Sequence, residues 1–417
     1  MFFAQSVQNR RFNLAFCTNF HIIFFMKPLG YIPRLISTHI QKLMEMYPVV
    51  TIAGPRQSGK TTLVRHLYPN FDYVSMEDIR ERQFFREDPT HFLQLHQAPC
   101  IFDEVQNTPE LLSYLQGIVD AEKRTGMYIL TGSRQMELQQ AITQSLAGRN
   151  GIADLLPLSL QELSAVGIHD ERDTALFRGC LPRVFEYNLE PGQAYSDYLR
   201  TYVERDVRQL VNVRNLQAFE LFLKLLASRV GQVLNLAALS TDVGVSSSTI
   251  REWISVLEAS YIIFTLYPYH NNYGKRLIKS PKIFFTEPGL VPCLLGIESP
   301  SQLGRDPLLG NIFENMVIVE ALKNRFNTGK RPNLFFFRDT KGFEIDLILE
   351  EARQPRPIEI KSGMTFTPAM VKNVEKFANF VPDSLPPALI YAGADMGMFH
   401  NVQICNFTHY NNIFSET

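Results

Sequence analysis

A short polar loop between two glycines is the part of the sequence whose residue types most directly suggest chemistry. Glycines let the backbone turn its N–H groups toward phosphate oxygens, a following lysine reaches the terminal phosphates, and a threonine hydroxyl is a magnesium ligand. An apolar run precedes the loop and a helical pattern follows it, which argues against a chance match in a glycine-rich turn. The pattern predicts a nucleotide-binding loop formed by Gly54, Pro55, Arg56, Gln57, Ser58, Gly59, Lys60, Thr61 and Thr62.

Two acids, Asp103 and Glu104, close an apolar run that begins at Ala98. A buried strand has little structural reason to end in two carboxylates. Asp103 can hold magnesium, directly or through a water molecule, and Glu104 can polarise an attacking water. The pair therefore predicts hydrolysis of the nucleotide as well as binding.

Two further positions have both a functional and a structural interpretation. Ser133 ends the apolar segment 126–133 and either senses the terminal phosphate or simply closes a strand. Arg149 either stabilises the transferring phosphoryl group, from this chain or from a neighbouring copy, or is an ordinary surface arginine. The sequence leaves both alternatives open.

A second group of charged residues lies in the C-terminal region. Asp346 falls on a predicted strand, and Glu359 and Lys361 lie two positions apart on the next one, so these two share a face. Glu314, on a predicted helix over 311–322, adds a carboxylate. We expect the three acids to bind a divalent metal, with Lys361 helping to activate a water. The alternative is a solvated hairpin with alternating charges.

The elements that must position these residues change in kind along the chain. Strands and helices alternate from about residue 48 to 159, which predicts a parallel sheet with helices on both faces. Residues 160–230 are mainly helical. Strands return after residue 280, at 282–288, 333–339, 343–349 and 356–362. The fold class expected is therefore α/β and multidomain.

Residues 234–270 show a different pattern, in which two short helices flank a turn at Gly244 and a strand pair follows. This is typical of a winged helix-turn-helix, with Thr249, Arg251 and Glu252 on the exposed face of the second helix. A basic strip just beyond it can contact DNA phosphates, whereas the alternative is a packing module between domains. The strip consists of Lys275, Arg276, Lys279 and Lys282.

Four stretches together resemble prokaryotic AAA-type P-loop ATPases: GPRQSGKTTL, CIFDEVQ, ILTGSR and SLAGRNGIADLLPLSLQEL. Members of that family carry a C-terminal domain of unknown function that is placed with the restriction-endonuclease-like folds, the PD-(D/E)xK clan. The resemblance implies the sheet order 5-1-4-3-2 and assigns Asp346, Glu359 and Lys361 to a nuclease-type D…ExK pattern. One departure is Gly179-Cys180, where the family usually has a glycine pair.

The composition is that of an ordinary globular protein, with 45% hydrophobic residues and a net charge of −1. Any contact with nucleic acid must therefore come from a local patch. The five cysteines contain no CxxC pair and fit a reducing, cytoplasmic compartment. The sequence contains no uninterrupted apolar run of about 18 residues, so it predicts no membrane span.

The expected division is an extension over 1–26, poorly ordered or an over-called start, and four further parts. These are an ATPase domain (27–165), a helical linker (166–213), a winged helix-turn-helix (214–278) and a restriction-endonuclease-like domain (279–417). The expected function is ATP hydrolysis with Mg²⁺, coupled to DNA binding or processing, in a homo-oligomer; nuclease activity is left open. The alternative is a nucleotide-dependent switch whose C-terminal domain is an inactive protein-interaction module.

Overall fold

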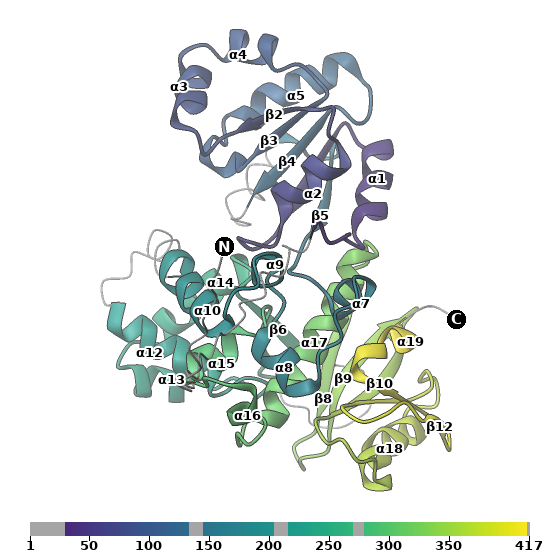
Figure 1. Ribbon diagram of the computed structural model, residues 1–417. Coiled ribbons are helices and arrows are strands. Elements are labelled where there is room, and N and C mark those ends of the chain that lie inside the picture. Colours follow the sequence, from purple (N-terminus) through teal and green to yellow (C-terminus); the bar gives the residue numbers. More distant parts are fainter. Residues whose placement is uncertain (1–29, 133–144, 204–215, 270–278, 415–417) are drawn as a thin grey trace, which may run out of the picture.

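The computed structural model describes residues 30–132, 145–203, 216–269 and 279–414. The predicted extension, Ser133, Lys275 and Arg276 lie outside these ranges. Figure 1 shows an upper lobe that contains the N-terminal sheet and a lower lobe that contains the rest of the chain.

The upper lobe is a five-stranded parallel sheet with the order β2-β3-β4-β1-β5. Read from β5, this is the predicted order 5-1-4-3-2, which is confirmed. The strands are β1 (Val49–Ala53), β2 (Asp72–Ser75), β3 (Cys100–Asp103), β4 (Tyr128–Gly132) and β5 (Asn150–Asp154). The helices are α1 (Ser37–Met46), α2 (Lys60–Leu67), α3 (Ile79–Glu87), α4 (Pro89–Leu95) and α5 (Leu111–Glu122).

Apolar side chains on alternate positions of β1 fill two separate cores. Val50 and Ile52 pack with residues of α1 and α2, whereas Val49 packs with Leu130 and with residues of α5. Burial on both faces is what the continuous apolar runs of this region predict for a parallel sheet. All five strands point the same way, so their carboxyl ends form one edge.

Helices dominate the first part of the lower lobe. Ser246 begins the last of them by accepting a hydrogen bond from the Thr249 N–H (3.1 Å). Ile250, Ile254 and Leu257 are buried, and Arg251 and Glu252 are exposed, as the sequence predicts. The helices are α7 (Leu160–Ala165), α8 (Arg172–Arg178), α9 (Pro182–Glu186), α10 (Pro191–Tyr198), α12 (Leu216–Ala227), α13 (Leu236–Val243) and α14 (Ser247–Ala259).

An eight-stranded mixed sheet forms the rest of the lower lobe, in the order β12-β13-β11-β10-β9-β8-β6-β7. Its strands are β6 (Ile263–Pro268), β7 (Lys282–Phe285), β8 (Leu334–Arg338), β9 (Glu344–Glu351), β10 (Gln354–Lys361), β11 (Ala388–Tyr391), β12 (Gly397–Phe399) and β13 (Val402–Asn406). The helices are α15 (Leu290–Leu295), α16 (Pro300–Leu303), α17 (Leu309–Asn327), α18 (Lys372–Phe380) and α19 (Asn411–Phe414).

This sheet joins two of the expected domains. β6 and β7 lie on opposite sides of the expected boundary at 278/279, yet they pair with each other, and β6 also pairs with β8. β6, expected within the winged helix-turn-helix, is thus continuous with the C-terminal sheet, and its partner β7 is a strand expected in the C-terminal domain. The winged-helix and restriction-endonuclease-like assignments, and the domain boundaries, stay predictions.

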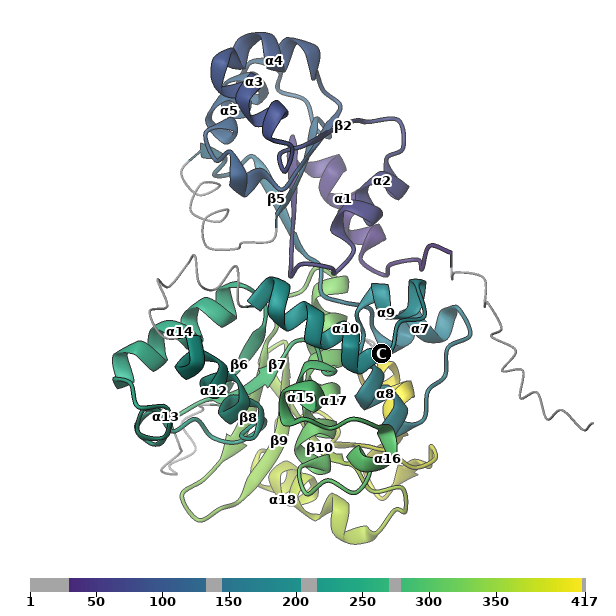
Figure 2. The same cartoon turned by 60° about the vertical axis from the view of Figure 1, so that its left-hand side comes forward.

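Helices cover both faces of the C-terminal sheet. Leu347 and Leu349 of β9 pack in a core with residues of α17, and Ile348 packs in another core with residues of α18. Figures 1 and 2 show that one end of α17 approaches the upper lobe. This long helix therefore connects the C-terminal sheet to the junction between the lobes.

Candidate functional site

The loop 54–59 joins the carboxyl end of β1 to the first turn of α2. Gly54 must be glycine, because a Cβ there would lie 2.1 Å from the carbonyl oxygen of Leu155. Gly59 has φ 91°, a left-handed conformation that favours glycine, and it begins α2 without a side-chain cap. The N–H groups of the first turn of α2 are therefore oriented as an anion-binding helix end.

Lys60 is buried and folds back over this loop. Its Nζ donates hydrogen bonds to the carbonyl oxygens of Gly54 (3.1 Å) and Pro55 (2.9 Å). Burial lowers the pKa of the Lys60 ammonium, and the carboxylates of Glu104 and Asp103 oppose that shift. Lys60 is thus held against the start of the loop, near the two acids predicted to act with it.

Asp103, the last residue of β3, accepts hydrogen bonds from three hydroxyl groups. Thr61 Oγ1 lies 2.9 Å from its Oδ2, and Tyr73 OH lies 2.7 Å from the same oxygen. Thr131 Oγ1 donates to the other oxygen, Oδ1. Burial and the hydrogen bond to Asp103 raise the pKa of Tyr73. The predicted pair of magnesium-binding residues, Thr61 and Asp103, is therefore in direct contact.

Glu104, the residue after Asp103, has an unusual backbone conformation. Its φ of 56° and ψ of 47° place a non-glycine residue in the left-handed region, which costs about 1–2 kcal/mol. The Glu104 N–H donates to Thr131 Oγ1 (3.2 Å), and Gln106 Nε2 donates to its carboxylate. The hydrogen bonds to Thr131 and Gln106 hold Glu104 in this conformation directly after Asp103.

The residues present fit a bound magnesium nucleotide. Ser58 Oγ is buried, and no described residue forms a hydrogen bond with it. An anion at the start of α2 would give that hydroxyl an acceptor, and Thr61 with Asp103 would supply oxygen ligands of the kind that Mg²⁺ takes. Thr62, also predicted to bind phosphate, lies exposed on the first turn of α2.

A pocket of about 280 Å³ opens beside Gly59 and Thr62. Tyr31 on its wall stacks on His66 of α2, with ring centroids 3.7 Å apart and planes at 19°. The remaining lining combines apolar and polar side chains from three parts of the chain: Gly30, Ile32, Arg34, Leu158, Pro182 and Glu186. Sequence reasoning missed these residues, because their approach to the loop depends on the tertiary fold.

Arg149 lies at the opposite end of the sheet from the loop. It precedes Asn150, which pairs with Val49 at the start of β1, whereas the loop follows Ala53 at its end. One strand length, about 16 Å, separates the two edges. Arg149 Nη2 instead lies 3.0 Å from Asp120 Oδ2, and its Nη1 donates to the Ala147 carbonyl. The geometry thus argues against Arg149 acting on the loop of its own chain.

The C-terminal acids form pairs with two lysines. Lys361 Nζ lies 2.7 Å from Glu359 and 3.2 Å from Asp346 across the β9–β10 hairpin, as the sequence predicts. Lys282 Nζ lies 2.9 Å from Glu314 and 2.7 Å from Glu344. Among the described residues, no group of three or more histidines, cysteines or acids is arranged to hold a metal ion.

Burial changes the pKa values of the acids in this cluster. It raises the pKa of Glu314 to about 7 and that of Glu359 to about 8, with the Asp346 carboxylate adding to both shifts. The pKa values of Lys282 and Lys361 are raised by the neighbouring carboxylates, which outweigh burial. Glu359 Oε2 is buried and has no hydrogen-bond partner among the described residues.

One member of the predicted basic strip is in the wrong place for DNA. Lys282 is only 2% exposed, because it begins β7 and is enclosed by Glu314 and Glu344. Of the strip, Lys279 is described and exposed. The local electrostatic support for DNA binding is therefore weaker than the sequence suggests.

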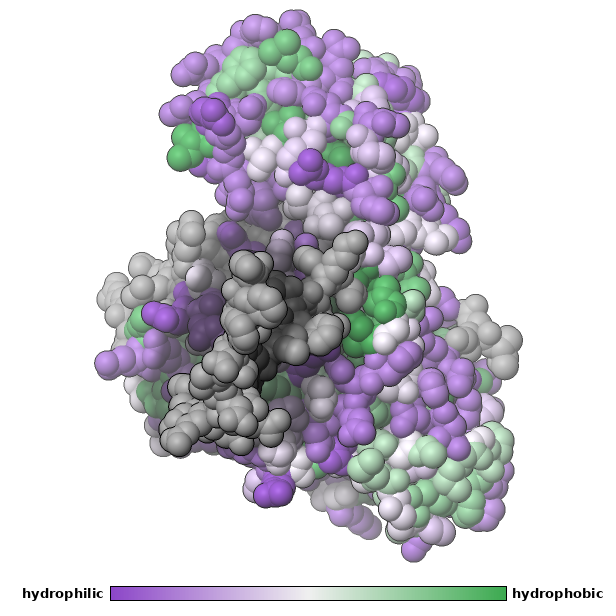
Figure 3. Space-filling view, in the orientation of Figure 1, coloured by the Kyte–Doolittle hydropathy of each residue, from purple (hydrophilic) through white to green (hydrophobic). Residues whose placement is uncertain are grey.

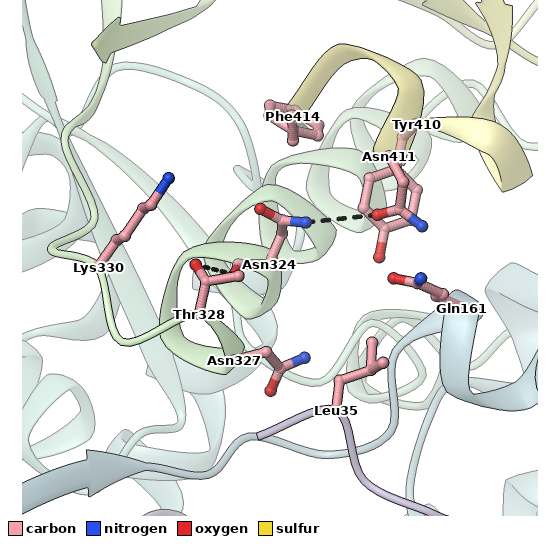
Figure 4. A pocket seen from close by; sticks show the side chains of 9 residues that line it. All are labelled: Leu35, Gln161, Asn324, Asn327, Thr328, Lys330, Tyr410, Asn411 and Phe414. Atoms are coloured by element: carbon pink, nitrogen blue, oxygen red, sulfur yellow. Dashed lines mark hydrogen bonds between the residues drawn. The ribbon is translucent and has the colours of Figure 1, made fainter. Parts of the chain in front are cut away.

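A larger pocket of about 460 Å³ lies at the junction of the lobes (Figure 4). None of the residues of the nucleotide loop lines it. Asn324 and Asn411 share a hydrogen bond of 3.4 Å at its centre. The lining is Leu35, Gln161, Asn324, Asn327, Thr328, Lys330, Tyr410, Asn411 and Phe414.

In Figure 3, hydrophilic residues predominate on the visible face of the upper lobe. No helix in the described part of the chain is long and apolar enough to cross a bilayer.

The loop, the acid pair and the strand order define a P-loop domain of the AAA type. In agreement, residues 46–164 match a family described as an AAA domain. Residues 169–301 and 309–410 match two families described as domains of unknown function. The AAA match and the site together support ATP binding and hydrolysis.

Most of the chain is also similar to two uncharacterised proteins. An uncharacterised protein of Mycobacterium tuberculosis is 29% identical over 345 residues, covering 82% of this chain and 76% of that protein. An uncharacterised protein of Methanocaldococcus jannaschii is 20% identical over 349 residues, covering 76% and 75%. Among solved structures, a Walker-type ATPase of Pyrococcus abyssi is 14% identical, covering 62% of this chain and 94% of its own, with a TM-score of 0.40.

Proposed function

We propose that this protein is a magnesium-dependent ATPase. The observation that carries the proposal is the direct contact of Thr61 with Asp103, beside the buried Lys60 and at the edge where β1 and β3 end. In the proposed complex, the N–H groups of the loop bind the phosphates, and Thr61 and Asp103 hold Mg²⁺. Glu104 positions the attacking water, and Lys60 leaves the loop carbonyls to contact the terminal phosphates.

The pocket beside Gly59 is the proposed site for the base and ribose. Ile32 and Leu158 supply apolar contacts, and the Tyr31 ring supplies a flat face, which are features that pockets for planar ligands use. A matched pair of variants tests this: Leu158→Ala should weaken ATP binding, whereas Leu95→Ala, an exposed leucine in α4, should not. Equal affinities of the two variants for ATP would exclude this pocket as the site for the base and ribose.

A homo-oligomer is proposed from the position of Arg149. Since it lies at the far edge of its own sheet, a role of Arg149 in hydrolysis requires the site of a neighbouring copy. Its ion pair with Asp120 is exposed, so it is weak enough to be exchanged for a stronger partner.

We propose that the C-terminal domain is a module switched by the nucleotide state. In support, Lys282 and Lys361 neutralise the acids that a metal would need, and the described residues offer no three-ligand metal site. The second candidate is metal-dependent cleavage of DNA, which the juxtaposition of Asp346, Glu359 and Lys361 favours. DNA binding by α14 goes with this second candidate.

One experiment separates the candidates. The wild type, Lys60→Ala and Asp346→Ala are assayed for ATP hydrolysis and for cleavage of linear and branched DNA, with Mg²⁺ or Mn²⁺. The switch predicts ATP hydrolysis that only Lys60→Ala abolishes, and no cleavage by any protein. Cleavage that Asp346→Ala abolishes would establish the nuclease. No ATP hydrolysis by the wild type would contradict the ATPase itself.

The four described cysteines are free thiols. This supports the proposed cytoplasmic location.

A further inference from the structure

Arg34, which precedes β1, is buried against the nucleotide loop. Its Nη1 donates to the carbonyl oxygen of Ser58 (2.7 Å), and its Nη2 donates to the carbonyl oxygen of Leu156 (2.6 Å). The side chain is 4% exposed. One guanidinium therefore ties the loop to the segment that leaves β5.

Glu162 of α7 fixes the orientation of this arginine. Its Oε1 accepts from Arg34 Nε (3.1 Å) and from the Leu35 N–H (2.7 Å). Its Oε2 accepts from the Ser159 N–H (2.8 Å), and the Ser159 hydroxyl accepts from the Glu162 N–H in return. This capping box makes the carboxylate part of the first turn of α7, so Arg34 is fixed to that helix.

The same segment, 156–160, is bonded on its other side to α17. Lys323 Nζ donates to the carbonyl oxygen of Leu158 (2.7 Å), and Glu320 Oε2 accepts from the Leu160 N–H (2.8 Å). Glu320 and Lys323 are 2.7 Å apart and each is 1% exposed. Tyr410 OH also donates to Glu320, at 2.8 Å. Charged groups buried in this way hold their partners in one geometry, because leaving either one unpaired costs several kcal/mol.

These contacts form a continuous path from the nucleotide loop to α17. We propose that Arg34 is a positioning residue that transmits the state of the nucleotide loop to α17. The inference rests on the proposed ATP binding. For Lys60 to reach a phosphate, its bonds to the carbonyl groups of Gly54 and Pro55 must break, and in the proposed coupling the loop then changes conformation. Gly54 lies against Leu155, and the Ser58 carbonyl group is hydrogen-bonded to Arg34. A change in the loop would therefore displace residues 155–158.

The receiving helix also carries part of the C-terminal acid cluster. Glu314 precedes Glu320 by six residues, about 9 Å along the axis of α17. A displacement of α17 at Glu320 is thus carried to the Glu314–Lys282 pair. In the proposed switch, the part of the C-terminal region that responds to the nucleotide is the first half of α17, which carries Glu314.

The experiment is hydrogen exchange of α17 peptides with and without a non-hydrolysable ATP analogue. Arg34→Lys keeps the charge but loses the fork that reaches both carbonyl groups. Arg86→Lys, on the exposed face of α3, is the matched control. We expect nucleotide to change exchange in residues 309–327 of the wild type and the control. Because Arg34 also lines the proposed base and ribose pocket, Arg34→Lys is compared at a saturating concentration of the analogue, where its α17 response should be lost.

Direct titration of the analogue separates the two proposals. A wild type that does not bind it overturns the proposed function, and the coupling with it. A wild type that binds without any α17 response, or an Arg34→Lys protein that responds like the wild type, overturns the coupling alone. If Arg34→Lys does not fold or does not bind the analogue, Glu162→Gln is used, because Glu162 does not line the pocket. It retains an acceptor for Arg34 but removes the buried charge, so it should reduce the response, and an undiminished response would likewise overturn the coupling.

Discussion

Thr61 Oγ1 and Asp103 Oδ2 lie 2.9 Å apart, although 42 positions separate the two residues in sequence. Thr61 belongs to the first turn of α2, and Asp103 ends β3, which is not a neighbour of β1 in the sheet. Parallel strands with a common carboxyl edge bring them together. A hydroxyl group and a carboxylate at that edge are what a magnesium nucleotide needs.

Removing the threonine hydroxyl should separate metal use from folding. We expect Thr61→Ala to reduce ATP hydrolysis by about two orders of magnitude or more, because the metal supplies several kcal/mol to the transition state. Thr61→Ser keeps the hydroxyl and should stay close to the wild type. Steady-state phosphate release over a Mg²⁺ titration measures both. Equal rates for the alanine and serine variants would contradict the assignment.

Glu104 should affect hydrolysis but not binding. Glu104→Gln removes the charge that polarises water, so we expect the turnover rate to fall about 10²–10⁴-fold. The affinity for a fluorescent ATP analogue should stay the same, since the side chain is not assigned to phosphate or metal. Glu87→Gln, an exposed acid in α3, is the control. Unchanged turnover in Glu104→Gln would move the base to another residue.

Complementation tests Arg149 across copies. Arg149→Ala and Lys60→Ala should each be nearly inactive alone, with about a 10³-fold loss for a residue that stabilises the transferring phosphoryl group. Mixed together, they should recover activity, because an intact Arg149 of one copy then faces an intact loop of the other. If Arg149→Ala alone hydrolyses ATP at the wild-type rate, Arg149 is a surface arginine paired with Asp120.

Much of the nucleotide site could be predicted because its residues are contiguous. The loop 54–62 and the acids 103–104 are each a local pattern whose spacing encodes chemistry. The edge on which Arg149 lies was also within reach of the sequence, because a residue before a parallel strand must lie opposite the residues that follow the strands. The strand order came from the resemblance, and the structure confirms it.

Other features depend on long-range packing. Arg34 and Glu162 are 128 positions apart, and nothing near either residue marks it as part of the site. Lys282 follows other basic residues and was assigned with them, but the apolar run 283–285 after it was a signal that it begins a buried strand. Its partners Glu314 and Glu344 come from α17 and β9, so only the fold reveals the pairing.

The acid cluster predicts a pH-dependent stability. The folded pKa values of Glu314 and Glu359, about 7 and about 8, lie above the ordinary value of 4.5. The folded state therefore binds more protons, so the stability these groups contribute is fully present below pH 4.5 and is lost as pH rises through 7–8. Glu359→Gln should flatten this decline. Urea unfolding of both proteins between pH 5 and 8.5 measures it, and parallel curves would contradict it.

Gly179 should be a strict requirement of the junction between α8 and α9. Its φ of 63° and ψ of −153° are accessible almost only to glycine, and a Cβ would lie 2.0 Å from Tyr195 OH. We expect Gly179→Ala to lower the free energy of unfolding by about 2 kcal/mol or more. Gly167 also has a positive φ, but a Cβ there would meet no atom within 4 Å. Gly167→Ala should therefore lower the free energy of unfolding less in the same denaturation experiment. Equal losses would show that the contact with Tyr195 is unimportant.

The hydrogen bonds of Lys60 to its own loop have a consequence for affinity. Before a nucleotide can use this ammonium, it must displace two internal acceptors, each worth about 1.5–3 kcal/mol to a charged donor. The loop thus competes with its ligand, and the loss of even one such bond corresponds to about a tenfold or greater weakening of affinity. A nucleotide must therefore be more abundant to fill this site than to fill one whose lysine has no such internal acceptors. The threshold for occupation is therefore set by the backbone of the loop as well as by the nucleotide.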